Sequence, residues 1–503
     1  MPDDPDQLKA MLLAERAESD RLRQIIKELQ RHRFGRRAES LPEDQLHLAL
    51  EEAEQVEAAG HAETEEKTPV ERQARAAKRR ANRGALPAHL PRIETVVDVE
   101  STVCPCCSGT LHRIGEDVAE RLDIVPAQFR VLVVRRPKYG CRVCQDVMVQ
   151  APAPARLIEG GLPTEATVAQ VLVSKFADHL PLYRQAQIYG RQGVDLDRST
   201  LADWVGRAAF LLRPIQERLF DRLKASPKLF ADETTAQVLD PGRGRTKTGQ
   251  LFAYVRDDRP WGRSDPPGAV YLYAPDRKAE RPIAHLAGFS GVLQVDGYGG
   301  YKVLARRNAV QLAFCWSHVR RRFYELAQSG PAPIATEALA RIAAIYQIES
   351  NIRGQSPEER RAVRQQHSRP LVAAFQPWLR GKLALISQKT KLAEAIRYAL
   401  SRWDGLCLFI DDGRIEIDNN VVEHAIRPLV LTRKNALFAG SDSGADHWAT
   451  IASLIETCKL IGVDSQAYLT DVITRIVNGH PQNRLDELLP WAYAAEPALR
   501  NVA

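Results

Sequence analysis

The sequence predicts a multidomain protein of the α/β class. With 503 residues the chain has room for about three or four domains. Its apolar share of 44% is ordinary for a protein that buries substantial cores. Between residues 228 and 322, runs of apolar, β-branched and aromatic residues alternate with polar turns and helical patterns. We therefore expect N-terminal modules in front of an α/β domain.

Residues 1–34 are expected to form an N-terminal helix. Leu8, Leu22 and Leu29 follow a seven-residue spacing, which is typical of a coiled coil. Glu15 stands where this spacing calls for an apolar residue. A short coiled coil and an amphipathic helix packed on its own protein both fit the pattern.

The composition of residues 35–92 indicates a charged linker. Residues 43–66 are acidic, whereas residues 72–83 are basic and include Arg79 and Arg80. A flexible arm that binds phosphates through these arginines is one interpretation, and a solvated run of charges is the other. The net charge of +7 fits nucleic acid binding but also fits many enzymes.

The sequence also favours a cytoplasmic location. Its start, MPDDPDQLKA, is acidic and lacks the apolar segment of a secretory signal. No run of about 18 apolar residues, the length of a membrane span, occurs in it. Eight cysteines in such a chain point to thiols and metal binding rather than to disulfides.

Residues 93–150 are expected to form a zinc ribbon. Two Cys-x-x-Cys pairs fall in this short segment, and four thiolates suit tetrahedral zinc. A segment of this size needs a stabilising metal ion, because it cannot bury much of a core by itself. The four filled positions predict a structural zinc, whose ligands would be Cys104, Cys107, Cys141 and Cys144. Cys106 is a surplus thiol and leaves the choice of the first pair open.

Residues 156–215 predict a group of short helices that resembles a helix-turn-helix. The pattern gives a helix, a turn around Gly193, and a second helix capped by Ser199. That second helix would enter the major groove of DNA, with Arg198 and Trp204 as candidate contacts. A three-helix packing unit without DNA contacts gives the same pattern.

The order of elements in residues 226–322 is strand, strand, strand, helix, strand, short helix, strand. This is the order of a ribonuclease-H-like α/β core. Residues 323–405 look wholly helical and would form an insertion. The second part of the core would follow in residues 406–465, and residues 466–503 would form a helical tail.

Two aspartates stand out in the predicted core. Asp232 interrupts the apolar strand KLFADETTAQVL, and Asp296 follows the strand GVLQV. A buried charge is costly unless it is paired or bound to a metal. The first and fourth strands of a ribonuclease-H-like sheet are neighbours, so the two carboxylates would face one another. We expect Mg²⁺ between them, because it prefers oxygen ligands and bridges carboxylates to phosphate.

Glu423 is the favoured third acidic ligand. It begins a predicted helix that also carries Arg427, Arg433 and Lys434. The carboxylate would hold the ion while these basic residues hold the DNA backbone. The other candidates lie in the segment DDGRIEID, which looks like a solvated turn, and they are Asp411, Asp412, Glu416 and Asp418.

These motifs together resemble transposases of the insertion sequence 66 family, the TnpC type. The acidic motifs of that family correspond to ADET, VDGYGGY and NNVVEHAIRP. The block RKNALFAGSDSGADHWATIASLIETCK, the linker LPAHLPR and the segments CPCC and KYGCRVC extend the likeness nearly from end to end. The chain departs from the family at His424, where Arg is usual, and at Thr432, where Gly is usual.

The resemblance implies a DDE transposase with a ribonuclease-H-like catalytic domain. Its triad would be Asp232, Asp296 and Glu423, which would hold two Mg²⁺ ions. These ions would activate water to cut DNA at the element ends and then activate the freed 3′-hydroxyl to attack target DNA. Cys315 and His318 resemble a Cys-x-x-His that follows the second Asp in several such families, although core packing explains them equally well.

The resemblance also implies partners. We expect double-stranded DNA, namely the terminal repeats and the target, together with a homo-oligomer and accessory proteins from the same element, in the nucleoid of a bacterium and without a membrane. The expected DNA contacts are Arg427, Arg433, Lys434, Asn435, Arg198, Arg79 and Arg80. Two other functions fit the same fold: a regulator that binds DNA without cutting it, and a nuclease that does not join strands.

Overall fold

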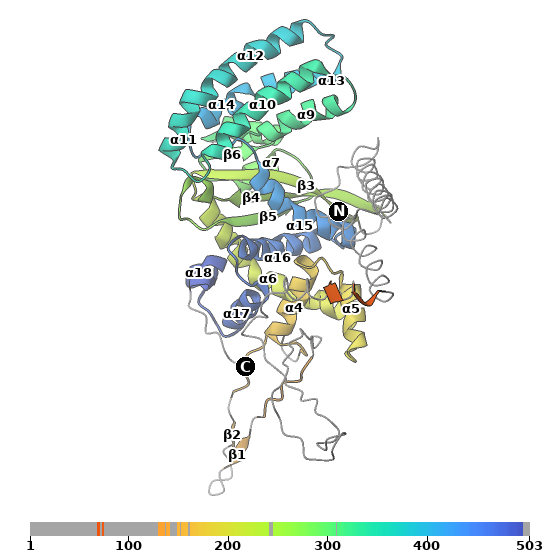
Figure 1. Cartoon of the computed structure of the whole chain (residues 1–503). Helices are drawn as coiled ribbons and strands as arrows, with labels where there is room; N and C mark the ends of the chain where they lie inside the picture. The colour runs from red at the N-terminus through yellow and green to blue at the C-terminus, as the bar shows by residue number, and fades with distance from the viewer. Residues whose placement is uncertain are drawn as a thin grey trace, which may run out of the picture. The chain divides into compact units, whose positions relative to one another are not determined.

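The computed structural model describes residues 68–70, 73–74, 129–135, 137–140, 148–150, 152–158, 161–240, 245–307 and 309–495 (Figure 1). The chain divides into two units, Met1–Ala127 and Gln128–Ala503, and the architecture below is that of the second. Several predictions concern parts of the chain outside the described residues. They are the N-terminal helix of residues 1–34, the basic residues Arg79 and Arg80, and the zinc ligands Cys104, Cys107, Cys141 and Cys144.

Two short strands flank the second cysteine pair in the sequence. Strands β1 (Lys138–Gly140) and β2 (Met148–Gln150) pair antiparallel, with Lys138 opposite Gln150. The residues between them in the sequence, 141–147, include Cys141 and Cys144 and lie outside the described part of the chain.

The predicted helical segment consists of α4 (Glu165–Phe176), α5 (Leu182–Arg191) and α6 (Arg198–Lys224). The turn around Gly193 is confirmed, and its φ of +78° explains why glycine stands there. The predicted cap was wrong by two residues. Asp197 caps α6, because its carboxylate accepts a 2.7 Å hydrogen bond from the amide of Ser199.

A five-stranded sheet lies at the centre of the unit. Its strands are β3 (Lys228–Asp240), β4 (Arg245–Arg256), β5 (Gly268–Ala274), β6 (Gly291–Val295) and β7 (Val310–Phe314). The spatial order is β5-β4-β3-β6-β7. The β3–β4 and β4–β5 pairs are antiparallel, whereas the β3–β6 and β6–β7 pairs are parallel. The first and fourth strands are thus neighbours, as predicted.

Short connections join the later strands. Helix η1 (Arg259–Trp261) follows β4, α7 (Glu280–His285) precedes β6, and α8 (Gly299–Arg307) links β6 to β7. The central strands carry apolar runs because both faces of the sheet are covered. In β3 the four residues from Lys228 to Ala231 are all buried, and in β4 so are the last eight.

The residues after β7 are helical, and we refer to the helices from α9 to α14 as the insertion. Its helices are α9 (Trp316–Gln328), α10 (Pro333–Asn351), α11 (Pro357–Val363), η2 (Arg364–Ser368), α12 (Arg369–Ala384), α13 (Lys391–Leu400) and α14 (Trp403–Asp411). They share a hydrophobic core with β6 and β7 around Trp316, whose indole donates a 2.8 Å hydrogen bond to the carbonyl of Leu406.

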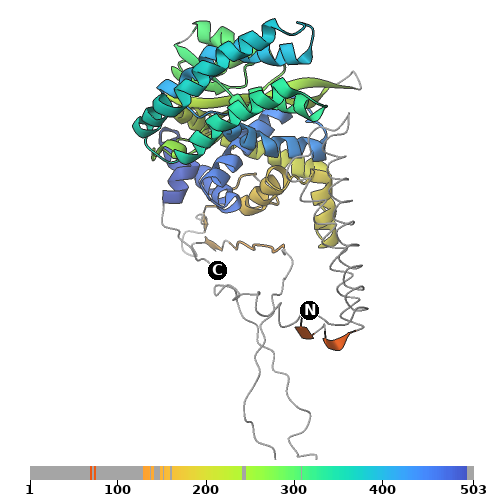
Figure 2. The ribbon, with the colours of Figure 1, turned by 45° about the horizontal axis from the view of Figure 1, so that its top comes forward.

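The last helices return to the sheet. They are α15 (Asn420–Ala436), α16 (Asp442–Leu460), α17 (Ser465–Val477), η3 (Gln482–Leu488) and α18 (Pro490–Ala495). The insertion helices and the layer of α6, α15 and α16 lie on opposite sides of the sheet in both views (Figure 1 and Figure 2). Ser453 and Thr457 of α16 accept hydrogen bonds from main-chain amides of β5. These bonds satisfy amides of a strand at the edge of the sheet.

Helices α4 to α6, the sheet and α15 to α17 bury one continuous hydrophobic core. Trp204 belongs to it and is only 4% exposed, so its prediction as a DNA contact was wrong. The helical pattern placed it on α6 correctly, but tertiary packing turns the indole inward. Among the described helices, none combines the length and the hydropathy that crossing a membrane requires.

Candidate active site

Strand pairing brings Asp232 and Asp296 together. The parallel register of β3 and β6 pairs Phe230 with Gln294. Two residues further along both strands, Asp232 therefore lies level with Asp296, at the point where β6 ends. Carboxylate oxygens of Asp232, Glu233 and Asp296 lie within 4.8 Å of one another. The structure thus assembles the two predicted aspartates and adds Glu233, which the sequence analysis did not single out.

The crowding of negative charge changes the acidity of the site. The pKa of Asp232 rises to about 8, chiefly because the carboxyl is buried and then because Asp296 and Glu233 lie beside it. Glu423 contributes to the same shift from further away. Burial also raises the pKa of Glu233, and the guanidinium of Arg277 opposes that shift. A site of this kind favours a bound cation.

Protein groups already hold Glu233. Arg277 donates a 2.8 Å hydrogen bond from Nε to Oε1 of Glu233, and the hydroxyl of Tyr301 donates to Oε2 at 3.2 Å. The guanidinium of Arg277 also lies 4.3 Å from the centre of the Tyr298 ring. Because both oxygens of Glu233 have partners, Asp232 and Asp296 are the better candidates for metal ligands.

The insertion fixes the loop that follows Asp296. The hydroxyl of Tyr398 donates a 2.8 Å hydrogen bond to the main-chain oxygen of Asp296, and Arg402 donates to the carbonyl of Gly297 at 3.3 Å. Gly297 has a φ of +108°, and a Cβ there would lie 2.4 Å from Nε of Arg402. Only glycine meets both demands. The guanidinium groups of Arg402 and Arg322 lie 3.8 Å and 4.0 Å from the Tyr398 ring centre.

Buried amides anchor the start of α15. Nε2 of Gln294 donates to the carbonyls of Glu416 and Asp418, and its Oε1 accepts from the amide of Glu416. Asn419, which is fully buried, donates from Nδ2 to the carbonyl of Ala231 at 3.3 Å. These bonds place the first turn of α15, with Glu423, beside Ala231 of β3 and near the end of β6.

Glu423 lies closest to a different pair of side chains. Its Oε1 is 3.8 Å from Nδ1 of His318, and donor atoms of Cys315, His318 and Glu423 all lie within 4.8 Å of one another. Burial raises the pKa of the Cys315 thiol to about 12. The structure therefore brings Glu423 near the two aspartates without including it in their cluster. It also places Cys315 and His318 beside Glu423, whereas the sequence alone did not distinguish a functional pair from core packing.

The segment before α15 is not the solvated turn that was predicted. Only Asp411 is largely exposed, where it pairs with Arg369. Asp412 is half-buried and pairs with Arg414. The carboxylate of Glu416 lies 2.8 Å from the guanidinium of Arg360, which is 2% exposed. The prediction was wrong because alternate residues of this short segment pack into the core.

The predicted DNA contacts on α15 differ in their exposure and in their hydrogen bonds to the rest of the chain. Arg433 donates to the carbonyl of Thr235 at 2.6 Å and to its hydroxyl at 2.7 Å, so it ties α15 to β3. Asn435 is exposed and donates to the carbonyl of His179 at 3.1 Å. Lys434 is exposed, and Arg427 is partly buried.

The structure also locates two further residues that the sequence analysis singled out. Arg198 is exposed at the first residue of α6. Thr432, where the resembled family has Gly, is buried, and its hydroxyl lies 2.8 Å from Nδ1 of His179. The threonine at this departure from the family pattern therefore has a hydrogen-bonding partner within the chain, His179.

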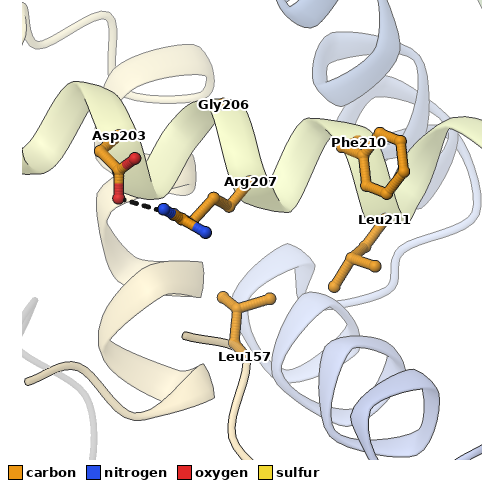
Figure 3. Close-up of a pocket in the computed structure, with 6 residues that line it drawn as sticks. All are labelled: Leu157, Asp203, Gly206, Arg207, Phe210 and Leu211. Carbon is orange, nitrogen blue, oxygen red and sulfur yellow. Dashed lines mark hydrogen bonds and ion pairs between the residues drawn. The ribbon is translucent and has the colours of Figure 1, made fainter. Parts of the chain in front are cut away.

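A cavity of about 380 Å³ lies on α6, away from the carboxylates (Figure 3). Its lining residues are Leu157, Asp203, Gly206, Arg207, Phe210 and Leu211. Asp203 and Arg207 pair along α6 at 2.8 Å, and Phe210 is 71% exposed. It offers no reactive group beyond that ion pair, so the carboxylate site remains the candidate for chemistry.

Family models match nearly the whole chain. A model described as "Transposase IS66 family" matches residues 160–447, and one described as "IS66 C-terminal element" matches residues 453–491. A "zinc-finger binding domain of transposase IS66" matches residues 101–145. A model described as "Transposase C of IS166 homeodomain" matches residues 21–95.

Three relatives from Sinorhizobium fredii (strain NBRC 101917 / NGR234) are similar over most of the chain. The uncharacterized protein y4jD is 44% identical over 99% of this chain and 98% of its own length. The uncharacterized protein y4qI is 43% identical over 98% of both chains. The uncharacterized protein y4hP is 39% identical over 93% of this chain and 88% of its own.

Proposed function

The chain belongs to the IS66 family of transposases, and we propose that it binds the ends of an insertion sequence, cleaves them and joins them to target DNA. The reaction would be a metal-dependent phosphoryl transfer. The observation that carries the proposal is the pairing of Asp232 and Asp296 on neighbouring parallel strands, with Glu423 on the helix beside them.

The architecture supports a ribonuclease-H-like core. Strands β3, β4 and β5 come first and pair antiparallel. Strands β6 and β7 follow and extend the sheet on the other side of β3, parallel to it. In that fold the first strand carries one catalytic carboxylate and the fourth strand carries the next. Asp232 on β3 and Asp296 directly after β6 would correspond to these two carboxylates. The helical insertion then separates them in sequence from Glu423.

The residues fit a divalent cation. The oxygens of Asp232 and Asp296 are close, and their mutual repulsion helps to raise the pKa of Asp232. A cation between them would relieve this repulsion, and an all-oxygen donor set suits Mg²⁺. When bound, two Mg²⁺ ions would stabilise charge on the phosphate and make the attacking oxygen more acidic.

The side chains of the chain would have separate tasks in this reaction. Asp232 and Asp296 hold the cations, and Glu423 is the proposed third ligand. Tyr398 and Arg402 keep the Asp296 loop in place. Lys434, which is exposed on α15, would neutralise backbone phosphates together with Arg427 and the arm residues Arg79 and Arg80, and Asn435 would add a hydrogen bond to the backbone.

The remaining modules would bind the element ends. The zinc-finger match to residues 101–145 supports a structural zinc held by Cys104, Cys107, Cys141 and Cys144. Double-stranded DNA would be the partner, and a homo-oligomer would hold two ends together, with accessory proteins of the same element as further partners.

One experiment separates the possible functions. The full chain is incubated with linear element ends, target DNA and Mg²⁺, and joined products are sought. We expect joined products from the wild type and none from Asp232→Asn or Asp296→Asn, with end binding retained in both variants. Binding without any cut would indicate a regulator, and cuts without joined products would indicate a nuclease. Either result would contradict the proposal.

A further inference from the structure

We propose that Cys315, His318 and Glu423 form a second metal site, distinct from the paired aspartates, for a divalent cation of the zinc class. The donor set is the first reason. A thiol, an imidazole and a carboxylate have donor atoms within 4.8 Å of one another. Sulfur and nitrogen ligands select zinc-like cations, whereas Mg²⁺ prefers oxygen. The two clusters therefore differ in the metal that they favour.

The fold places these donors independently of any metal. Cys315 is the N-cap of α9, and His318 follows in the first turn of the same helix. Glu423 lies in the first turn of α15. The amide of Asn419 donates to the sulfur of Cys315 at 3.2 Å, which ties the two helix starts together. All three residues thus lie at helix N-termini, where the helix dipole favours the anionic forms of the thiol and the carboxyl.

An unpartnered atom points to a ligand rather than to packing. Within the described part of the chain, the buried Nδ1 of His318 has no hydrogen-bond partner. The nearest carboxylate oxygen, Oε1 of Glu423, is 3.8 Å away, which is too long for a hydrogen bond. Two ligands of one tetrahedral zinc lie about 3.3 Å apart, given bonds of about 2.0 Å. A contraction of about half an ångström would let both atoms bind one ion.

Core packing alone accounts for only one of the three residues. Cys315 is 2% exposed and would suit a core without any metal. The side chains of His318 and Glu423, however, are 30% and 40% exposed. Their exposure gives an ion a route to the cluster and leaves a fourth position for water.

The second site shares Glu423 with the proposed catalytic site. Glu423 has a single carboxylate, and a zinc-class ion would hold it on the side of His318. Occupation of the second site would then withdraw the third ligand from the ions at Asp232 and Asp296. Zinc would therefore inhibit Mg²⁺-dependent strand joining. This consequence rests on the proposed function, whereas binding of the ion does not.

Metal binding is measured on the full chain without DNA. Protein that already carries its ribbon zinc is titrated with Zn²⁺, and in parallel with Co²⁺, whose absorption reports a bound thiolate. We expect one further ion per chain. Cys315→Ser and His318→Ala should each weaken its binding by more than about tenfold, an effect that even outer-shell changes reach. His318→Ala also covers the case in which Cys315→Ser does not fold.

Three controls identify the source of the further ion. Cys407→Ser changes a half-buried thiol outside the cluster and should retain the ion. Cys106→Ser should also retain it, because this surplus thiol belongs to the predicted ribbon. Asp232→Asn should retain it too, since the site does not use the paired aspartates. The proposal is overturned if no further ion binds, if the ion persists unchanged in both Cys315→Ser and His318→Ala, or if it disappears in Cys106→Ser.

Strand joining then tests the consequence. Zn²⁺ at the concentration that fills the second site should suppress joining at fixed Mg²⁺ in the wild type, and His318→Ala should resist this suppression. Equal suppression of both proteins would contradict the shared role of Glu423. A chain that binds the further ion but never joins DNA would refute the proposed function and leave the metal site standing.

Discussion

The hydroxyl of Tyr398 donates a 2.8 Å hydrogen bond to the main-chain oxygen of Asp296. This bond connects the last turns of α13, in the insertion, to the loop that carries the second carboxylate of the sheet. Arg402 reinforces the connection through the carbonyl of Gly297. The insertion is therefore part of the site and does more than separate its residues in sequence.

Tyr398→Phe should loosen the Asp296 loop while it keeps the aromatic ring between Arg322 and Arg402. Loss of one buried hydrogen bond should lower the free energy of unfolding by about 1 kcal/mol. Mg²⁺ affinity and strand joining should fall by about tenfold, the scale of outer-shell changes around metals. Isothermal titration with Mg²⁺ measures the change in Mg²⁺ affinity. Tyr324→Phe on α9 is the matched control, and an unchanged Mg²⁺ affinity in Tyr398→Phe would refute the positioning role.

Glu416→Gln should destabilise the protein, because it removes the nearer carboxylate from the buried guanidinium of Arg360 and leaves only Glu349, at 3.9 Å. Removing one partner of a buried ion pair costs about 3 kcal/mol or more. Urea unfolding measures the change, with Glu358→Gln, an exposed residue in the first turn of α11, as the control. Equal stability of the two variants would show that the pair contributes nothing. Because Glu416 is structural, it is a poor control for catalysis.

Metal-free protein should lose stability as the pH rises from about 4 to about 8. The ordinary pKa of an Asp side chain is 3.8, whereas that of Asp232 in the folded chain is about 8. Between these values the folded chain binds a proton that the unfolded chain releases, so rising pH favours unfolding. Urea unfolding at pH 5 and pH 8 should show a smaller loss in Asp232→Asn than in the wild type. Identical losses of stability in the two proteins would contradict the raised pKa of Asp232.

Arg198→Ala should weaken the binding of element ends more than that of random DNA, if α6 reads sequence. Its stability should change by less than about 0.5 kcal/mol, because Arg198 is exposed. Trp204→Ala should instead cost about 3–5 kcal/mol, as expected for a large buried side chain. Fluorescence anisotropy with both DNAs gives the comparison, and Arg380→Ala on α12 is the control. Equal losses on both DNAs would limit Arg198 to backbone contact.

Much of the fold follows from local sequence patterns. Apolar runs broken by polar turns predicted the strands, and the acidic interruption of one such run identified Asp232. The neighbouring position of Asp296 followed from likeness to a ribonuclease-H-like sheet, in which the first and fourth strands are adjacent. The helical insertion followed from the long stretch between Asp296 and Glu423, which exceeds what a compact core needs. The strand predictions depend on residues that are close in sequence.

The errors arise where distant residues meet. Glu416 looks polar and exposed until Arg360, which comes from α11, packs against it. Trp204 lies on a face of α6 that belongs to the core shared by α4 to α6, the sheet and α15 to α17. Glu233 escaped notice because nothing in its sequence marks it, apart from its place next to Asp232. Cys315 and His318 stayed ambiguous because their partner, Glu423, is more than one hundred residues away.

Glu423→Gln tests the central claim most directly. This variant keeps the shape of the side chain but removes the charge that would balance Mg²⁺. Element ends, target DNA and Mg²⁺ are mixed with the variant, and binding and joined products are measured on the same samples. Glu325→Gln, an exposed carboxylate on α9, is the control and should behave as the wild type.

We expect Glu423→Gln to bind element ends at least as well as the wild type, because phosphate affinity comes from basic residues and the variant removes a negative charge. Its joined products should fall by several orders of magnitude, as expected when a metal-positioning group is lost. Joining at the wild-type rate by Glu423→Gln would contradict the account, because the third ligand would then have to be another residue.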